Sequence, residues 1–214
     1  VVLAGRRVER LKDLCAEIEA DGGDAHVVKL DVTDLASIRA AVAHAETEVG
    51  TLDILVNNSG VSTSQRLVDV TAEDWDFVIN TNQRGAFFVA QEVGKRMLAR
   101  AKGSAPGTFT GGRIVNIASQ AAKSAFPQAA AYCASKHGLV GLTRVAAIEL
   151  AAHGITVNAV CPNHVTTALG AWQNERYGKA RKPFAAKNSP KQSPMPHKRW
   201  LQSMKNKLMD LPEH

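Results

Sequence analysis

Cysteine is scarce in this sequence, and its pattern excludes two classes of site. Cys15, Cys133 and Cys161 are the three cysteines, and no CxxC pair occurs. An odd count without paired spacing argues against a disulfide framework or a cysteine zinc site, and it favours a reducing, cytoplasmic compartment. The seven histidines form no HExxH motif and no cluster with cysteine. We therefore expect no protein-bound metal.

Long apolar runs are missing as well, although 45% of the residues are hydrophobic. That hydrophobic content excludes disorder throughout the chain. No run approaches the roughly 18 residues that a membrane span needs, and no signal peptide opens the sequence. We therefore expect a cytoplasmic protein without a membrane partner.

Acidic residues are few at one end of the chain. Residues 170–214 hold ten Lys and Arg residues but three Asp and Glu residues. The whole chain has a net charge of +6. This shift predicts a folded domain over residues 1–169 and a basic, poorly ordered tail over 170–214. Binding of nucleic acid or an anionic membrane by the tail is one alternative function, and it would weaken steeply with salt. A solvated tail is favoured, because no nucleic-acid motif is present.

Strand-like and helix-like segments alternate through residues 1–169. Short apolar runs predict strands at 1–5, 26–30, 53–58, 113–117 and 155–160. Helical periodicity predicts helices at 7–20, 35–49, 82–101 and 129–152, and Thr71 with Asp74 resembles the capping box of another. This alternation predicts an α/β fold with a doubly wound parallel sheet and helices on both faces. Ligands of such sheets bind at the carboxyl ends of the strands.

Side chains suited to proton transfer occur at two of the predicted elements. Tyr132 and Lys136 are four residues apart, which places them on one face of a helix. An ammonium beside a phenol favours the phenolate, so this tyrosine could exchange a proton with a carbonyl or alcohol oxygen. Ser119, at the end of a predicted strand, could hydrogen-bond the same oxygen. A surface pair and a loop serine are the alternatives for each pattern alone.

The tetrad Asn57-Asn58-Ser59-Gly60 ends the third predicted strand. Asparagine side chains there can tie neighbouring strands together, and Ser59 with Gly60 lets a flat ligand approach the backbone. An ordinary turn fits this tetrad equally well.

In their order and spacing, these motifs resemble the short-chain dehydrogenase/reductase family, in its main single-domain branch and near its 3-oxoacyl-acyl-carrier-protein reductases. The resemblance covers residues 1–169. It rests on NNSG at 57–60, Asn82 to Gly85 for the family's NxxG, Ser119, and YxxxK at 132–136. It implies a Rossmann-like fold and hydride transfer between NAD(P)(H) and a carbonyl or secondary alcohol.

The resemblance also implies a role for each matching residue. Tyr132 is the acid/base. Lys136 favours the phenolate form of this tyrosine and holds the ribose hydroxyls of the nicotinamide. Ser119 polarises the substrate carbonyl, and Asn82 holds a water that relays protons. The other implied cofactor-binding residues follow strands, and they are Arg6, Asp31, Val32, Asn58, Ser59, Gly60, Pro162, Val165 and Thr167.

The choice of nucleotide depends on the end of the first predicted strand. The family places an acid there for a free 2′-hydroxyl, whereas this sequence has Gly5 followed by Arg6. A guanidinium matches a 2′-phosphate, so NADP(H) is favoured over NAD(H). A solvated arginine at a helix N-terminus is the alternative.

Two parts of the family pattern are not found: the strand and glycine-rich turn TGxxxGxG that open it, and its last strand. We therefore expect a sheet without its first and last strands, whose edges lack partners. An alternative function follows, a catalytically incomplete relative that acts as a non-catalytic subunit. Helices 82–101 and 129–152 resemble the family's dimer surface and predict a homo-oligomer. The identity of the substrate cannot be read from the sequence.

Overall fold

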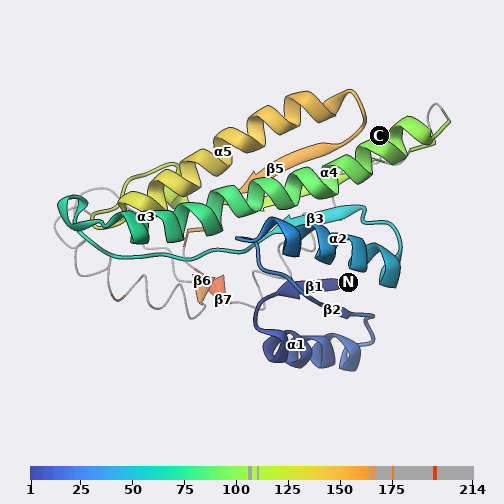
Figure 1. Cartoon of the computed structure of the whole chain (residues 1–214), viewed down its shortest axis with the longest axis horizontal. Coiled ribbons are helices and arrows are strands. Elements are labelled where there is room, and N and C mark those ends of the chain that lie inside the picture. The colour runs from blue at the N-terminus through green and yellow to red at the C-terminus, as the bar shows by residue number, and fades with distance from the viewer. Residues whose placement is uncertain (106–107, 110, 164, 167–174, 176–194, 197–214) are drawn as a thin grey trace.

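The computed structural model describes residues 1–105, 108–109, 111–163, 165–166, 175 and 195–196 (Figure 1). Strands and helices alternate as expected. The first half holds β1 (Val2–Gly5), α1 (Val8–Ala20), β2 (His26–Lys29), α2 (Leu35–Val49), β3 (Ile54–Asn57), η1 (Leu67–Asp69) and α3 (Ala72–Ile79). The second half holds η2 (Asn80–Gly85), α4 (Ala86–Gly103), β4 (Arg113–Ile117), η3 (Gln120–Ala122), α5 (Ala130–Ala151) and β5 (Thr156–Val160). Strands β6 (Val165–Thr166) and β7 (Met195–Pro196) form a two-residue parallel pair, so part of the predicted tail pairs with the end of the predicted domain.

The strands β1 to β5 form two parallel sheets instead of one. β1 pairs with β2, and β3, β4 and β5 form the second sheet in that order. The division falls between β1 and β3, where the expected sheet lacks its first strand. Ile54 and Val56 of β3 are 51% and 41% exposed, so this edge strand keeps apolar surface in solvent.

Helices lie on both sides of the sheet layer. In Figure 1, α1 lies below β1 and β2, α2 lies between these two strands and β3, and α5 lies above β5. One apolar cluster joins the two sheets and contains Val28 of β2, Ala41 of α2, Leu55 of β3 and Val89 of α4. Each fully buried aliphatic side chain contributes about 1.5–3 kcal/mol. Burial under α2 and α4 therefore holds together two sheets that share no ladder.

Most predicted helices begin within a residue or two of the expected position, and side-chain caps fix the starts of α2 and α3. The Asp34 carboxylate accepts a hydrogen bond from the Ala36 N–H at 2.9 Å and caps α2. The Thr71 hydroxyl accepts one from the Asp74 N–H at 3.2 Å and caps α3. Such caps satisfy N–H groups that the first helical turn leaves unpaired.

The predicted start of a helix at residue 82 is wrong. Residues Asn80–Gly85 form the π-helix η2, and α4 begins at Ala86. A π-turn carries an extra residue, which changes the direction of the side chains that follow. Here it directs Asn82 toward Val61, whose backbone N–H and carbonyl both bond to its amide.

Two kinds of feature are absent from the described part of the chain. None of its helices is long and apolar enough to cross a membrane. Within the same residues, no three His, Cys, Asp or Glu side chains gather closely enough to hold a metal ion.

Candidate active site

The candidate site lies at the carboxyl ends of the parallel strands. Arg6 follows β1, Asp31 follows β2 closely, Asn58 follows β3, and Ser119 follows β4 after one residue. Strands paired in parallel end at the same edge of a sheet, and the arrowheads in Figure 1 point to one side. The structure therefore brings these predicted residues to one edge of the molecule.

Tyr132 and Lys136 lie in the first two turns of α5, and both side chains are buried. The Lys136 Nζ lies 5.9 Å from the centre of the Tyr132 ring and donates a 2.7 Å hydrogen bond to the carbonyl oxygen of Ile117. Burial lowers the pKa of Lys136 to about 8, while the neighbouring Cys161 thiol acts in the opposite direction. The lysine can therefore gain or lose its proton near neutral pH.

Asn82 links three segments of the chain. Its Oδ1 accepts a hydrogen bond from the Val61 N–H at 2.7 Å, and its Nδ2 donates to the Val61 carbonyl at 2.9 Å and to the Ser135 Oγ at 3.1 Å. The Ser135 hydroxyl in turn donates to the backbone carbonyl of Tyr132 at 2.8 Å. Both hydrogens of the Asn82 amide are used within the protein, so this side chain fixes α5 against the loop that follows β3.

Sequence reasoning missed Ser135 of α5, which is fully buried and accepts a hydrogen bond from Asn82. One signal was present: a serine three residues after Tyr132 shares the helix face that carries Lys136. A small polar residue on that face needs a buried partner, because an unpaired hydroxyl is destabilising there.

Gly60 lies beside the buried lysine. A Cβ atom at Gly60 would lie 3.6 Å from both the Asn82 Oδ1 and the Lys136 Nζ. Asn58 and Ser59, on the same turn, are exposed. The turn after β3 therefore lies close to Lys136 at Gly60.

Asn57 ties neighbouring elements together, which confirms the structural role that the sequence suggests. Its Nδ2 donates to the Asn116 Oδ1 at 2.9 Å and to the Ala86 carbonyl at 3.1 Å. The Asn116 Nδ2 in turn donates a hydrogen bond to the Thr143 Oγ1 of α5 at 2.9 Å. Sequence reasoning missed Asn116 and Thr143, although an asparagine inside an apolar strand is a signal for a buried partner.

Ser119 caps η3 at the end of β4. Its Oγ accepts a hydrogen bond from the Ala121 N–H at 3.1 Å, which leaves the hydroxyl hydrogen able to donate to another oxygen. The next residue, Gln120, donates its N–H to the Pro162 carbonyl at 2.8 Å. This bond joins the segments after β4 and β5, so Ser119 and Pro162 lie in neighbouring loops.

The remaining predicted residues lie near the ends of β1 and β2 or in β6. The Asp31 Oδ1 accepts hydrogen bonds from the Thr33 N–H at 2.9 Å and hydroxyl at 2.7 Å. These bonds lower the pKa of Asp31, and the exposed Arg6 adds a smaller lowering. Val32 is buried and belongs to the apolar cluster of α2. Val165 lies in β6, and Thr167 lies outside the described residues.

Comparison with known proteins decides the family. The family model for short chain dehydrogenase matches residues 1–178. The chain belongs to the short-chain dehydrogenase family. Among solved structures, an actinorhodin polyketide ketoreductase variant with NADPH matches with a TM-score of 0.76 and 37% identity, covering 87% of this chain and 67% of that one.

Curated relatives carry different activities. D-threitol dehydrogenase of Mycolicibacterium smegmatis is 41% identical over 170 residues, which are 78% of this chain and 62% of that protein. The 3-oxoacyl-acyl-carrier-protein reductase of Staphylococcus aureus is 35% identical over 161 residues, which are 75% of this chain and 62% of that protein. This short-chain dehydrogenase therefore spans somewhat less than two thirds of the length of these relatives.

Proposed function

We propose that residues 1–169 form the catalytic domain of an NADP(H)-dependent oxidoreductase that interconverts a small carbonyl compound and its secondary alcohol. One observation carries the proposal: buried Lys136 lies beside Tyr132 and next to the turn at Gly60. Membership of the short-chain dehydrogenase family supports it. All three cysteines are free, which supports a place in the cytoplasm.

The residues present fit a nicotinamide nucleotide. Lys136 donates one hydrogen bond, to Ile117, so two of its N–H groups remain for the ribose hydroxyls of the cofactor. Gly60 lies close to that lysine, and exposed Asn58 and Ser59 precede it on the same turn. The bound cofactor would supply the hydride, and the protein would supply position and electrostatics.

Protons are then handled by this chain's own side chains. In the reducing direction, the Tyr132 hydroxyl gives its proton to the substrate oxygen as the carbonyl carbon is reduced, and it takes the proton back in the oxidising direction. The Ser119 hydroxyl donates a hydrogen bond to the same oxygen and stabilises its developing charge. The Lys136 ammonium stabilises the phenolate that remains, and Asn82 holds α5 in place for this step.

Arg6 supports the preference for NADP(H). Its exposed guanidinium follows β1 and lies close enough to Asp31 to lower the pKa of that carboxyl. A planar guanidinium binds phosphate through paired, charge-assisted hydrogen bonds. The solved ketoreductase with NADPH supports the same choice.

Nucleotide titrations of the 214-residue chain test the proposal. We expect NADPH to bind more tightly than NADH, and Arg6→Gln to weaken NADPH binding about tenfold while leaving NADH unchanged. Arg10→Gln, which removes another exposed charge from the same segment, is the control. Equal weakening of both nucleotides by Arg6→Gln would contradict the role of Arg6, and no binding of either nucleotide would contradict the cofactor site.

Loss of turnover in Tyr132→Phe tests the chemistry. The variant keeps the ring but lacks the proton, so we expect carbonyl-dependent NADPH oxidation to fall at least about a hundredfold with little change in nucleotide affinity. Unchanged turnover in Tyr132→Phe would show that another group transfers the proton.

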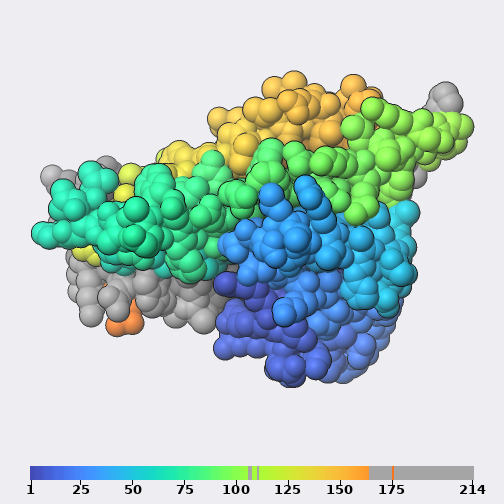
Figure 2. Space-filling model, in the orientation of Figure 1, coloured from blue at the N-terminus to red at the C-terminus, as the bar shows by residue number. Residues whose placement is uncertain are grey.

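A homo-oligomer through α4 and α5 is part of the same proposal. Phe87 of α4 is exposed, and Val145 and Ile148 of α5 are 54% and 79% exposed. Figure 2 shows the surfaces of α4 and α5 side by side along the upper part of the molecule. Exposed apolar side chains on two neighbouring helices suit a two-fold contact, in which each helix meets its copy.

The same surface favours the second candidate function, a non-catalytic subunit that pairs with a complete relative. Light scattering of wild type and Ile148→Glu separates the possibilities. A wild-type dimer that Ile148→Glu dissociates supports the homo-oligomer. A wild-type chain that stays monomeric but joins a complete relative supports the second candidate.

A further inference from the structure

The start of α5 has an unusual backbone for a segment that carries a proposed catalytic side chain. Ala129 precedes the helix without a side-chain cap, and Tyr132 lies in the first turn. Gln128, one residue earlier, has a φ of 62° and is the one described non-glycine residue in the left-handed region. That conformation is unfavourable for an L-residue with a side chain, so neighbouring contacts must hold it.

Those contacts come from the loop after β3. The Gln65 N–H donates to the Gln128 carbonyl at 3.1 Å, and the Ser64 hydroxyl donates to the Gln128 Oε1 at 3.2 Å. Gln65 and Ala129 also form an isolated parallel bridge. The residues just before α5 are therefore held by Ser64 and Gln65, not by a cap of their own.

The side chain of Gln65 extends this link to α3. Its Nε2 donates a 2.5 Å hydrogen bond to the Asp74 Oδ2, and Asp74 is itself fixed by the Thr71 hydroxyl that caps α3. The Gln65 Oε1 is buried without a partner. An unpaired buried acceptor is destabilising, so the favourable contribution of this amide is the bond that its Nε2 makes.

Apolar packing connects α3 to Tyr132. Val78 of α3 shares an apolar cluster with Ala129, Ala131 and Tyr132. A helix end that is fixed at α3 on one side and at Gln128 on the other leaves the tyrosine little freedom to move.

We propose that Gln65 is a positioning residue for Tyr132, acting with Asp74 as a clamp between the N-terminal ends of α3 and α5. The proposal rests on the proposed function for the meaning of Tyr132. The clamp itself is a structural statement that can be tested without turnover.

A fluorine label on Tyr132 provides that test. Tyr132 and Tyr177 are the two tyrosines of the sequence, so 3-fluorotyrosine in a Tyr177→Phe background gives one ¹⁹F resonance. Gln65→Glu places an acceptor against Asp74, and Gln65→Glu with Asp74→Asn restores a donor–acceptor pair in reverse. Gln65→Met removes the donor without adding charge, and Arg66→Ala, which removes an exposed ion pair with Asp69 in η1, is the matched control.

We expect the resonance to shift or broaden in Gln65→Glu and Gln65→Met, and to return toward the wild-type position in the double variant. The control should match wild type. In an active chain, kcat of Gln65→Glu should fall about tenfold while the KM for the nucleotide stays within about twofold, because small misplacements of a reacting group mainly slow the chemical step.

Wild-type resonances in both single variants would overturn the clamp, and so would a folded double variant without any recovery. Far-UV circular dichroism establishes which variants are folded. An inactive wild-type chain would instead contradict the proposed function, since the ¹⁹F comparison does not depend on activity.

Discussion

Lys136 combines deep burial with a positive charge, and these two features oppose each other. Its ammonium has lost most of its hydration and gains one hydrogen bond, to the Ile117 carbonyl, in return. The lowered pKa records the net disadvantage of the charged form in the folded chain. A residue placed at such a disadvantage is typical of a functional site.

The pH dependence of stability follows from this shift. At pH 7 the lysine is charged in both the folded and the unfolded state, so the folded state is destabilised by the full cost of burying that charge. Between about pH 8 and its ordinary value of 10.5, the folded lysine has lost its proton and the unfolded lysine has not. The unfolded state then binds more protons, and stability from this group rises with pH.

Lys136→Met should therefore raise the free energy of unfolding at pH 7. The removed burial term is roughly 3 kcal/mol and the lost hydrogen bond about 1 kcal/mol, so we expect a gain of roughly 2 kcal/mol. The gain should shrink as the pH approaches 10. Urea unfolding of both proteins across this range measures it, and a difference that stays constant with pH would contradict the assignment.

The element η2 connects two regions of the site. On one side, Asn82 bonds to Val61 and to Ser135 of α5. On the other, Gly85 packs against Val32, in the loop that the resemblance places beside the adenine. A shift of this π-turn would therefore move both regions together.

Gly85→Ala tests that junction. An added Cβ would lie 2.7 Å from the Val32 carbonyl oxygen, and backbone at that distance must move. We expect a loss of about 1–3 kcal/mol in unfolding free energy. Gly141→Ala is the matched control, because its Cβ would meet open space on α5, and it should stabilise by about 0.5–1 kcal/mol. Equal effects on urea midpoints would contradict the close packing at Gly85.

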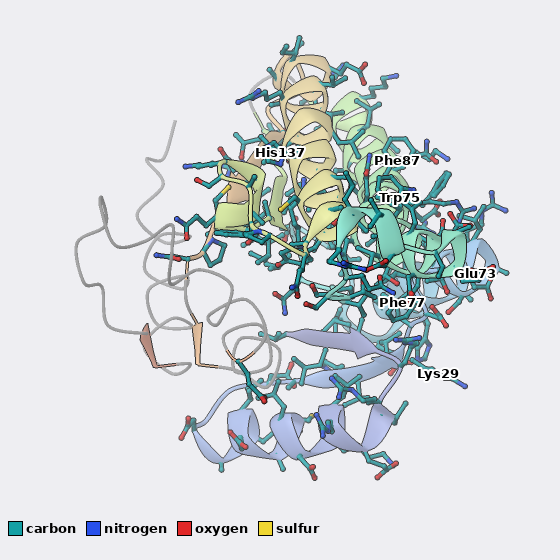
Figure 3. The ribbon with its side chains drawn as sticks, turned by 90° about the vertical axis from the view of Figure 1, so that its left-hand side faces the viewer. Lys29, Glu73, Trp75, Phe77, Phe87 and His137 are labelled. Carbon is teal, nitrogen blue, oxygen red and sulfur yellow. The ribbon has the colours of Figure 1, made fainter. Side chains whose placement is uncertain are left out.

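At the element scale, Figure 3 labels exposed side chains on three of the helices. Trp75 and Phe77 of α3, Phe87 of α4 and His137 of α5 are labelled there, and all four are exposed. Neighbouring positions on the same helices, such as Val78 and Lys136, are buried. Each helix thus presents one face to the site and core and another to solvent or a partner.

Across the whole molecule, side-chain burial replaces a continuous sheet. The β1–β2 pair and the β3–β4–β5 sheet share an apolar cluster but no strand ladder. β4 has partners on both sides, whereas β1 and β3 have one each among the described strands. Backbone groups on an unpaired edge rely on water, so they open more readily than those of a central strand.

Amide hydrogen exchange should show this difference directly. We expect the amides of β4 to be the most protected, with those of β1 and β3 exchanging at least about tenfold faster, in line with the range of local opening free energies in folded proteins. Native-state exchange on the 214-residue chain, resolved by peptide, measures it. Protection of β3 equal to that of β4 would indicate that its free edge is covered in solution.

Much of the fold could be predicted because local patterns determine it. Apolar runs and helical periodicity placed β1 to β5, α1, α2 and α5 within a residue or two. The link between neighbouring strands through the Asn57 side chain was predicted as well. The π-turn η2 was not, because residues 82–101 have ordinary helical periodicity. Its shape depends on contacts with Val61 and Val32, which are distant in sequence.

The sequence by itself determined the alternation of strands and helices, the end of the sheet where polar residues gather, and the pairing of Tyr132 with Lys136 on one helix face. Tertiary structure decided the burial that lowers the pKa of Lys136, the link from Asn82 through Ser135, and the hold of Gln65 on α5. Local spacing sets which face a side chain occupies. Desolvation and hydrogen bonding between distant segments arise once packing brings those segments together.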